Sequence, residues 1–106
     1  MINIKFYKDS EGYFKADIDV EHQLLGQYLE SEIQGVAGIC EDVLNIIKEI
    51  ELGDRALIEA VGNGYGLRLT AITATIWSEF TETELVLEIP LSDFKQVLEE
   101  CLKFCD

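Results

Sequence analysis

ALIEAVGNGYGLRLTAITATIWSEF, residues 56–80, is the stretch that decides the fold. Gly62-Asn63-Gly64 is the strongest turn signal in the chain, because glycine and asparagine tolerate the positive φ of tight hairpins. Residues 56–61 before this turn predict a short strand. Residues 65–72 continue as a strand, and residues 73–80 are rich in threonine, isoleucine and aromatic residues and are also extended. Together they predict either one long bent strand or two strands.

Strand patterns also occupy both flanks of this stretch. Residues 2–7 alternate apolar and polar side chains, which predicts a half-buried strand. Turn residues at 9–12 lead into a returning strand at 13–18, so the pair predicts a hairpin. Near the other end, residues 82–84 predict a turn, and residues 85–89 predict a last strand that a proline ends.

The remaining segments carry helical spacing. Asp19 predicts the N-cap of a first helix with apolar residues at 24–29, and two glycines separate it from a second helix at 39–50. Ser92 predicts the N-cap of the last helix, whose apolar stripe runs from 94 to 105. The chain is therefore expected to be one α+β domain over residues 1–106, with a mixed, mostly antiparallel β-sheet and helices packed on one face.

Charge restricts the kinds of partner. The chain has 21 acidic and 8 basic residues and a formal charge of −13. This balance argues against direct binding of nucleic acid, whose phosphates require lysine and arginine, and against anionic membranes. It favours a basic protein partner, because opposite charges accelerate association and suppress wrong partners. Solubility alone is the other explanation of the charge.

The acids concentrate where bases are missing. No lysine or arginine occurs between Lys15 and Lys48, and few occur between Arg68 and the chain end. Partner contact also needs a buried aromatic or aliphatic anchor, because exposed charges mainly alter the association rate. The residues expected to bind the partner are Asp17, Asp19, Glu21, His22, Tyr28, Glu30, Glu32 and Trp77. Trp77 is the only tryptophan, and it suits either the core or an interface.

No catalytic signature is present. The sequence has no nucleophile elbow, and its glycine-rich segment lies between two strands rather than before a helix. His22 could act as a general base beside Asp19 or Glu21, but a lone histidine in a first helical turn is more often a capping residue. Cys40, Cys101 and Cys105 are expected to be buried thiols rather than zinc ligands. The expectation is a protein that is not an enzyme and needs no cofactor or metal.

Location and assembly are less constrained. The first residues form a strand pattern rather than a secretory signal, and no apolar run reaches the ~20 residues of a membrane helix. The expected location is the cytoplasm. An exposed sheet edge could pair two copies, although no residue requires a homo-oligomer.

Scattered residues resemble the pattern of the uncharacterised bacterial YacL family. They are Asp9-x-x-Gly12, His22-x-x-x-Gly26 with Glu32 after it, Gly62 to Leu67, and Asp93-Phe94-x-Gln96-Val97. The chain is shorter than that pattern between Glu79 and Glu84. The resemblance implies a cytoplasmic α+β domain with an unknown binding role.

The chain also resembles, in size, charge and architecture, the immunity proteins of contact-dependent growth inhibition. That resemblance implies a protein that neutralises a cognate toxin, expected to be a nuclease of the RNase or tRNase class, by covering its basic active site. A YacL-type housekeeping protein of unknown binding function is the alternative. A small enzyme using His22 and neighbouring carboxylates is a third hypothesis.

Overall fold

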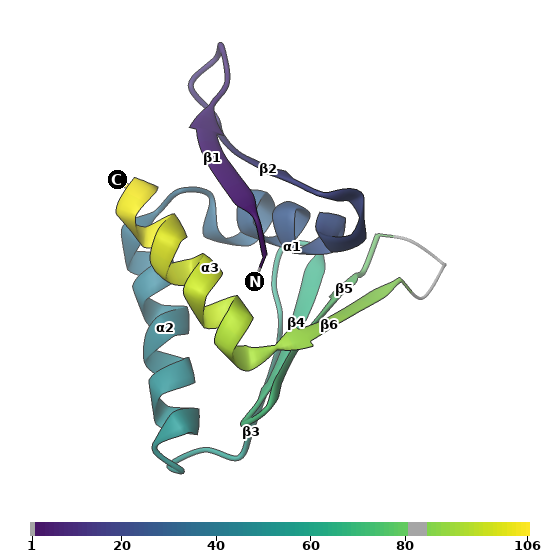
Figure 1. Ribbon diagram of the computed structural model, residues 1–106, viewed down its shortest axis with the longest axis vertical. Coiled ribbons are helices and arrows are strands. Elements are labelled where there is room, and N and C mark those ends of the chain that lie inside the picture. The colour runs from purple at the N-terminus through teal and green to yellow at the C-terminus, as the bar shows by residue number, and fades with distance from the viewer. Residues whose placement is uncertain (1, 81–84) are drawn as a thin grey trace.

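The computed structural model describes residues 2–80 and 85–106. Two strands at the N-terminus lead into a helical region, four further strands follow, and a helix ends the chain (Figure 1). The elements are β1 (Ile4–Lys8), β2 (Phe14–Ile18), a 3₁₀ helix (Val20–His22), α1 (Gln23–Tyr28), a π-helix (Leu29–Ile33), α2 (Ala37–Glu51), β3 (Leu57–Val61), β4 (Tyr65–Thr70), β5 (Thr73–Ser78), β6 (Val86–Pro90) and α3 (Leu91–Phe104).

The strands form two separate antiparallel sheets. β1 pairs with β2, and the second sheet has the order β3-β4-β5-β6. The predicted α+β class is confirmed. The strands of one expected mixed sheet are instead divided between two sheets, because α1 lies against the edge of β2 where a further strand would have to pair.

Residues 65–80 form two strands rather than one long strand. β4 and β5 are antiparallel neighbours, with Leu67 opposite Ile76 and Gly66 opposite Trp77. The reversal between them is held by the Thr70 hydroxyl, which accepts a hydrogen bond from the Thr73 amide at 2.9 Å. The predicted turn at residues 82–84 lies outside the described residues.

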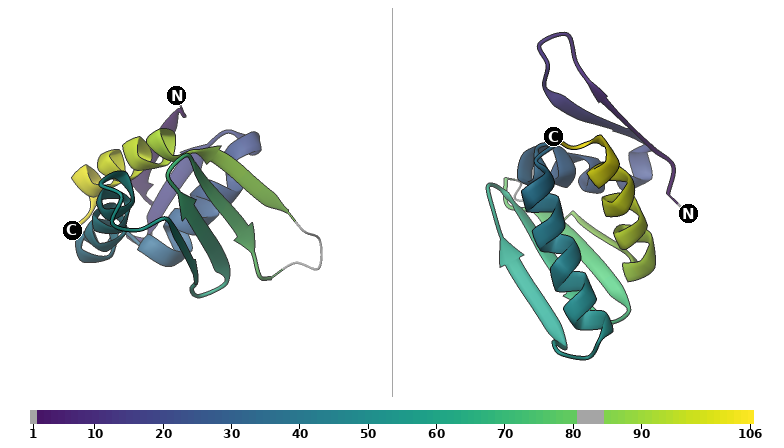
Figure 2. Two further views of the ribbon diagram at one scale, coloured as in Figure 1. Left: turned by 90° about the horizontal axis from the view of Figure 1, so that it is seen from below. Right: turned by 90° about the vertical axis from the view of Figure 1, so that its left-hand side faces the viewer.

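Helices α1, α2 and α3 lie on one face of the four-stranded sheet and leave the other face open, as Figure 2 shows. Alternation along β4 and β5 buries one side of each strand, because successive side chains point to opposite faces. Leu69 and Ile76 from the sheet are fully buried and belong to one hydrophobic cluster with Ile47 of α2 and Phe94 of α3.

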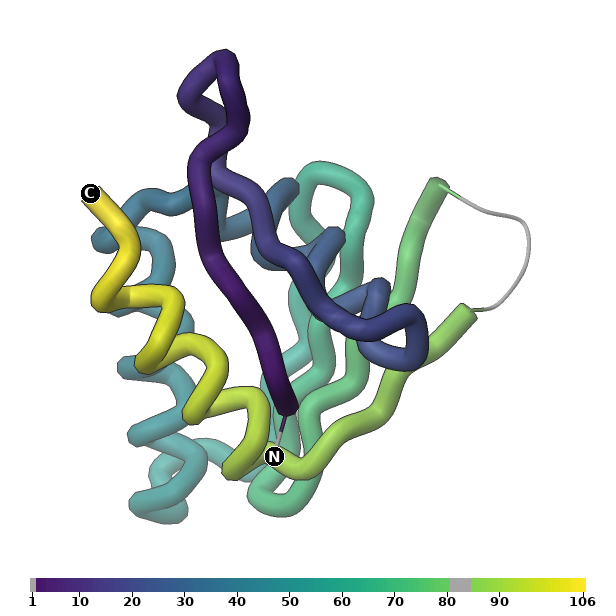
Figure 3. The backbone as a smooth tube through the Cα atoms, turned by 45° about the horizontal axis from the view of Figure 1, so that its top comes forward, coloured from purple at the N-terminus to yellow at the C-terminus, as the bar shows by residue number. Residues whose placement is uncertain are grey.

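The β1–β2 hairpin lies across α1 and α3 at the other end of the molecule (Figure 3). Its Phe6 and Phe14 rings contact each other, with centroids 5.6 Å apart, and both contact Phe104 at 6.1 and 5.8 Å. Aromatic pairs at such distances add to the apolar area that they bury. This cluster attaches the hairpin to the C-terminal end of α3.

Two predicted helix caps have different outcomes. Asp19 caps the 3₁₀ helix, because its side chain accepts the His22 amide at 3.0 Å. The expectation for Ser92 is wrong, since α3 begins at Leu91 directly after β6. The Leu91 amide, the first of the four without a partner in the helix, donates to the Ile72 carbonyl at 2.9 Å, so the β4–β5 turn satisfies it. Within the described residues, no helix has the length and apolarity needed to cross a membrane.

Candidate functional site

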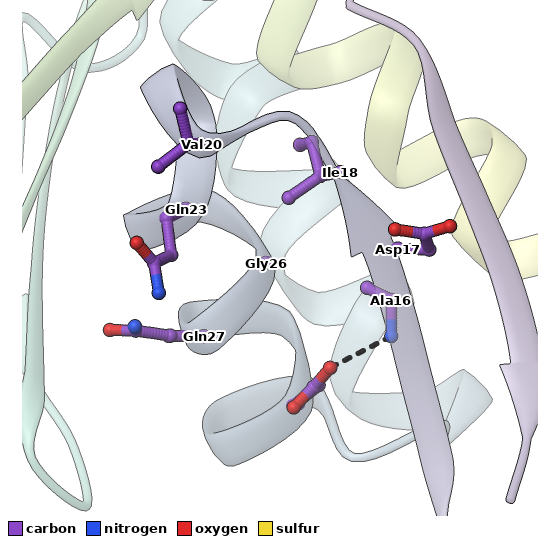
Figure 4. Close-up of a pocket in the computed structure, with 8 residues that line it drawn as sticks. Ala16, Asp17, Ile18, Val20, Gln23, Gly26 and Gln27 are labelled. Atoms are coloured by element: carbon purple, nitrogen blue, oxygen red, sulfur yellow. Dashed lines mark hydrogen bonds between the residues drawn. The ribbon is translucent and has the colours of Figure 1, made fainter.

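A groove of about 470 Å³ runs between β2 and α1. Gly26 lies at its floor, with β2 on one side and the amide side chains of Gln23 and Gln27 on the other (Figure 4). The residues that line it are Ala16, Asp17, Ile18, Val20, Gln23, Gly26, Gln27 and Glu30.

The close approach of α1 to β2 depends on Gly26. A Cβ atom at this position would lie 3.0 Å from Cγ2 of Ile18, which is tighter than an ordinary van der Waals contact. The main-chain N–H group of Ala16 points away from β1 and donates to Oε2 of Glu30 at 2.8 Å. Glu30 therefore ties the outer edge of β2 to the π-helix that follows α1.

The groove is acidic. Its lining within the described chain includes the carboxylates of Asp17 and Glu30 and no lysine or arginine. Asp17 is exposed and lies directly opposite Lys5 in the β1–β2 pair, and its carboxylate has no hydrogen bond, and no ion pair within 4.0 Å, with a described residue. Glu30 is half-buried and lies 3.7 Å from Nζ of Lys15. Glu21, in the adjacent 3₁₀ helix, is also exposed. The carboxylates of Asp17, which has Lys5 opposite it, and of Glu21 are thus the ones available to a ligand.

Asp19 and His22 form a local pair rather than a catalytic dyad. Nδ1 of His22 lies 2.7 Å from Oδ1 of Asp19, which also accepts the His22 amide. The hydrogen bond with the His22 side chain holds the pKa of Asp19 below its usual range. The pair closes one helical turn, and neither residue lines the groove.

Glu32 is engaged in the fold. Its carboxylate accepts the amide of Asn63, with Oε2 at 2.8 Å, and so holds the turn between β3 and β4. The π-helix is therefore hydrogen-bonded to both sheets: Glu30 bonds to β2 of the two-stranded sheet, and Glu32 bonds to the β3–β4 turn of the four-stranded sheet. π-helical turns of this kind occur frequently at functional sites.

The aromatic candidates divide between core and surface. Tyr28 is 5% exposed and packs against Phe94 with ring centroids 6.1 Å apart, so burial keeps it from a partner and raises its pKa well above the usual range. Tyr65 donates its hydroxyl to Oε1 of Gln27 at 3.0 Å, beside the groove. Burial, followed by the charges of Glu30 and Glu32, raises the pKa of Tyr65.

Trp77 lies on the open face of the four-stranded sheet. It is partly buried against Gly66, and its indole N–H donates to Oε1 of Glu79 at 2.8 Å. The structure thus brings Asp17 and Glu30 together at the groove and leaves Trp77 on a different surface. The two glutamines of the groove, four residues apart, went unnoticed in the sequence, although their spacing with Glu30 predicts a shared helix face.

The three cysteines also converge, which their separation in the sequence did not indicate. Sγ of Cys101 lies 3.9 Å from Sγ of Cys105, and the Cys40 thiol of α2 donates to the Leu98 carbonyl of α3 at 3.3 Å. Burial raises the pKa of Cys40 to about 11 and raises that of Cys101 further. All three cysteines are free of disulfides, and the described residues contain no group of histidine, cysteine and acidic side chains suited to hold a metal ion.

Comparison with known proteins places the chain among uncharacterised proteins. Residues 2–105 match the model of an uncharacterised protein family, UPF0231. A UPF0231 protein of Shewanella oneidensis is 33% identical over 67 residues, which are 63% of this chain and 54% of that protein. A UPF0231 protein of Shewanella baltica is 31% identical over 83 residues, 76% of this chain and 67% of that protein. No solved structure matches the chain.

These matches correct the family expected from the sequence. The expected identification as an immunity protein of contact-dependent growth inhibition is wrong, because the family model and both relatives carry the UPF0231 name and none refers to toxin immunity. The residues that suggested the YacL family lie within the matched range, but the family named by the match is UPF0231. The matched stretch spans about half the length of the first relative, so the activity of a whole relative does not follow from this chain.

Proposed function

The chain belongs to the uncharacterised protein family UPF0231, and we propose that it is a binding protein, not an enzyme, that recognises a basic segment of a protein partner in the groove between β2 and α1. One observation carries the proposal. Asp17 and Glu21 are exposed carboxylates beside a groove whose described lining contains no base, and neither carboxylate has an ion pair with a described residue.

The rest of the described surface supports this choice of site. Six of the eight basic residues lie within 4.0 Å of an acid: Lys8, Lys15, Arg55, Arg68, Lys95 and Lys103. Of the two remaining bases, Lys48 lies on α2, whereas Lys5 lies directly opposite Asp17 in the β1–β2 pair. Among the described residues, Glu21 is therefore the acid beside the groove that has no base opposite it or within 4.0 Å. A partner can therefore supply a compensating charge.

The groove suits a guanidinium or ammonium group. Carboxylate oxygens accept charge-assisted hydrogen bonds from arginine and lysine, which are about twice as strong as neutral ones. The side-chain carbonyl of Gln23 adds a neutral acceptor on the opposite wall, whereas that of Gln27 already accepts the Tyr65 hydroxyl. The net charge of −13 steers a basic partner toward the protein and raises the association rate at low salt.

The proposal includes two broader statements. The protein acts without a cofactor, since its lone histidine is committed to Asp19. It acts in the cytoplasm, where free cysteines such as the three here stay reduced. Neutralisation of a cognate nuclease toxin is the special case in which the basic partner is a toxin, and only the charge and the groove support it.

The experiment identifies the partner and then measures it. Photo-crosslinking from Gln23 in the cells that produce the protein captures whatever lies in the groove, and the captured partner is purified for titration calorimetry. The double variant Asp17→Lys/Glu21→Lys is expected to weaken binding about tenfold or more at low salt, because two attractive charges become repulsive.

The matched control is Glu41→Lys/Asp42→Lys. These two acids are exposed on α2 and have no ion pair with a described residue, so the control changes the net charge equally but away from the groove. Equal weakening by both double variants would mean that net charge alone drives binding. Unchanged binding by the groove variant would refute the site.

A further inference from the structure

Strand β3 has a free edge. Figure 2 (right) shows it at the outer side of the four-stranded sheet, with no other element beside that side. The Gly62 amide donates to the Tyr65 carbonyl, and main-chain bonding alternates along an antiparallel pair. Hence Ile58 and Ala60 bond to β4, whereas the main-chain groups of Leu57, Glu59 and Val61 point outward.

One charged residue, Glu59, is the main protection of this edge against pairing, and Arg68 lies 4.0 Å from its carboxylate. Leu57 is 47% exposed and Val61 is 58% exposed. The strand contains no lysine, no proline and no bulge, which are further features that prevent edge-to-edge association. An edge with unpaired main-chain groups and exposed apolar side chains is a template for another strand.

An apolar groove of about 280 Å³ opens beside the same edge, between α2 and the helix-facing side of β3. Val43 and Ile46 of α2 line it on one side, and Ile58 and Ala60 of β3 line it on the other. A strand added to β3 would place alternate side chains next to this groove, because successive residues point to opposite faces.

We propose that the occupant is β3 of a second copy of this chain, paired antiparallel with Glu59 opposite Glu59. This register places Leu57 opposite Val61 of the second copy and Ile58 opposite Ala60. The outward-facing residues 57, 59 and 61 then form three hydrogen-bonded pairs. All six of their outward N–H and C=O groups are satisfied, and the two sheets become one eight-stranded sheet.

The sequence LIEAV favours a second copy over an unrelated strand. When two copies pair antiparallel, Leu57 lies opposite Val61 on the open face, on either side of the Glu59 pair. On the groove side the large Ile58 lies opposite the small Ala60. Charge points the same way. The edge carries one acid, and Nε of Arg68 lies 4.0 Å from its carboxylate, so this edge lacks the uncompensated acids of the β2–α1 groove.

Salt distinguishes this contact from the binding of a basic partner. Two copies of charge −13 repel one another, and the Glu59 carboxylates face each other across the proposed interface. Salt screens both repulsions, so added salt strengthens the dimer, whereas it weakens a complex between opposite charges. Failure of one proposal therefore leaves the other open.

The test is sedimentation velocity of the full chain from about 10 μM to about 1 mM, at low and high NaCl, because dimerisation follows mass action. The wild type is expected to shift from monomer to dimer, at lower concentration in high salt. Glu59→Pro is expected to raise the dissociation constant about tenfold or more, because it removes an N–H that faces only the free edge. Glu59→Gln is expected to lower it several-fold, because it removes the like-charge pair.

A cysteine cross-link tests the register. Position 59 meets its own copy at a Cα separation of about 5.5 Å, within disulfide range, whereas position 57 lies opposite position 61. In a Cys105→Ser background, Glu59→Cys is expected to form a covalent dimer on oxidation, and Leu57→Cys is expected not to. Asp17→Lys/Glu21→Lys serves as the control that retains the dimer. A wild type that stays monomeric at all concentrations, or a Glu59→Pro variant that dimerises normally, would overturn the proposal.

Discussion

Glu30 and Glu32 each accept a hydrogen bond from a main-chain amide, one in β2 and one in the β3–β4 turn. The two acids belong to the same acidic tract as Asp17 and Glu21, but their contacts are internal. A hydrogen bond to a charged group contributes about 1.5–3 kcal/mol, while an exposed unpaired acid contributes little. At the scale of single residues, the tract therefore combines structural acids with free ones.

Glu32→Ala is expected to reduce the free energy of unfolding by about 1–3 kcal/mol, because the Asn63 amide loses its acceptor. Urea denaturation measures this loss. Glu32→Gln keeps an acceptor oxygen and is expected to lose less. Glu21→Ala is the matched control, and its stability is expected to stay within about 0.5 kcal/mol of the wild type. Equal stability of Glu32→Ala and the control would show that the turn does not depend on this bond.

The buried thiol of Cys40 makes stability fall at alkaline pH. Burial raises its pKa to about 11 from an ordinary value of 9.0, so between these values the unfolded thiol loses its proton while the folded thiol keeps it. The stability from this group is fully present below pH 9.0 and is lost as pH rises toward about 11, by up to about 2 kcal/mol.

Cys40→Ala is expected to show a shallower decline over that range, although a smaller side chain lowers its stability at neutral pH. Urea denaturation at a series of pH values from 7 upward measures both slopes. Burial also raises the pKa values of Cys101 and Tyr28, so part of the alkaline decline remains in the variant. Parallel curves for variant and wild type would rule out the thiol as a cause.

At the scale of elements, the π-helix is the link between the two sheets. It carries both structural glutamates, and its apolar residues Leu29 and Ile33 are fully buried. The β4–β5 pair depends on a glycine, because the indole ring of Trp77 on β5 packs directly on Gly66, its partner on β4. A side chain at position 66 would overlap the indole ring.

Gly66→Ala is expected to displace Trp77 and to destabilise the protein by about 1–3 kcal/mol, as other overpacked sites do. Tryptophan fluorescence reports the displacement, because Trp77 is the only tryptophan. Gly38→Ala is the control: a Cβ there meets nothing within 4 Å, and alanine in a helix is favoured over glycine by about 1 kcal/mol. Unchanged fluorescence in Gly66→Ala would contradict the contact.

At the scale of the whole molecule, two surfaces differ in charge and in the partner that they favour. The β2–α1 groove is acidic and suits a basic ligand, whereas the β3 edge is nearly neutral and suits a second copy. They lie on different sheets, so a dimer formed through β3 leaves the groove accessible. Each copy of such a dimer could then bind one partner.

The sequence by itself determined the element types and most of their order, because alternation and helical spacing are local properties of neighbouring residues. It also indicated the turn at residues 62–64, the break before α2 and the buried stripe of α3. Tertiary structure alone decided that the strands form two sheets, that Glu30 and Glu32 are internal ligands of amides, and that Cys40 meets Cys101. The physical reason is that periodicity specifies which face of an element is buried, but the partner that covers this face comes from a distant part of the chain.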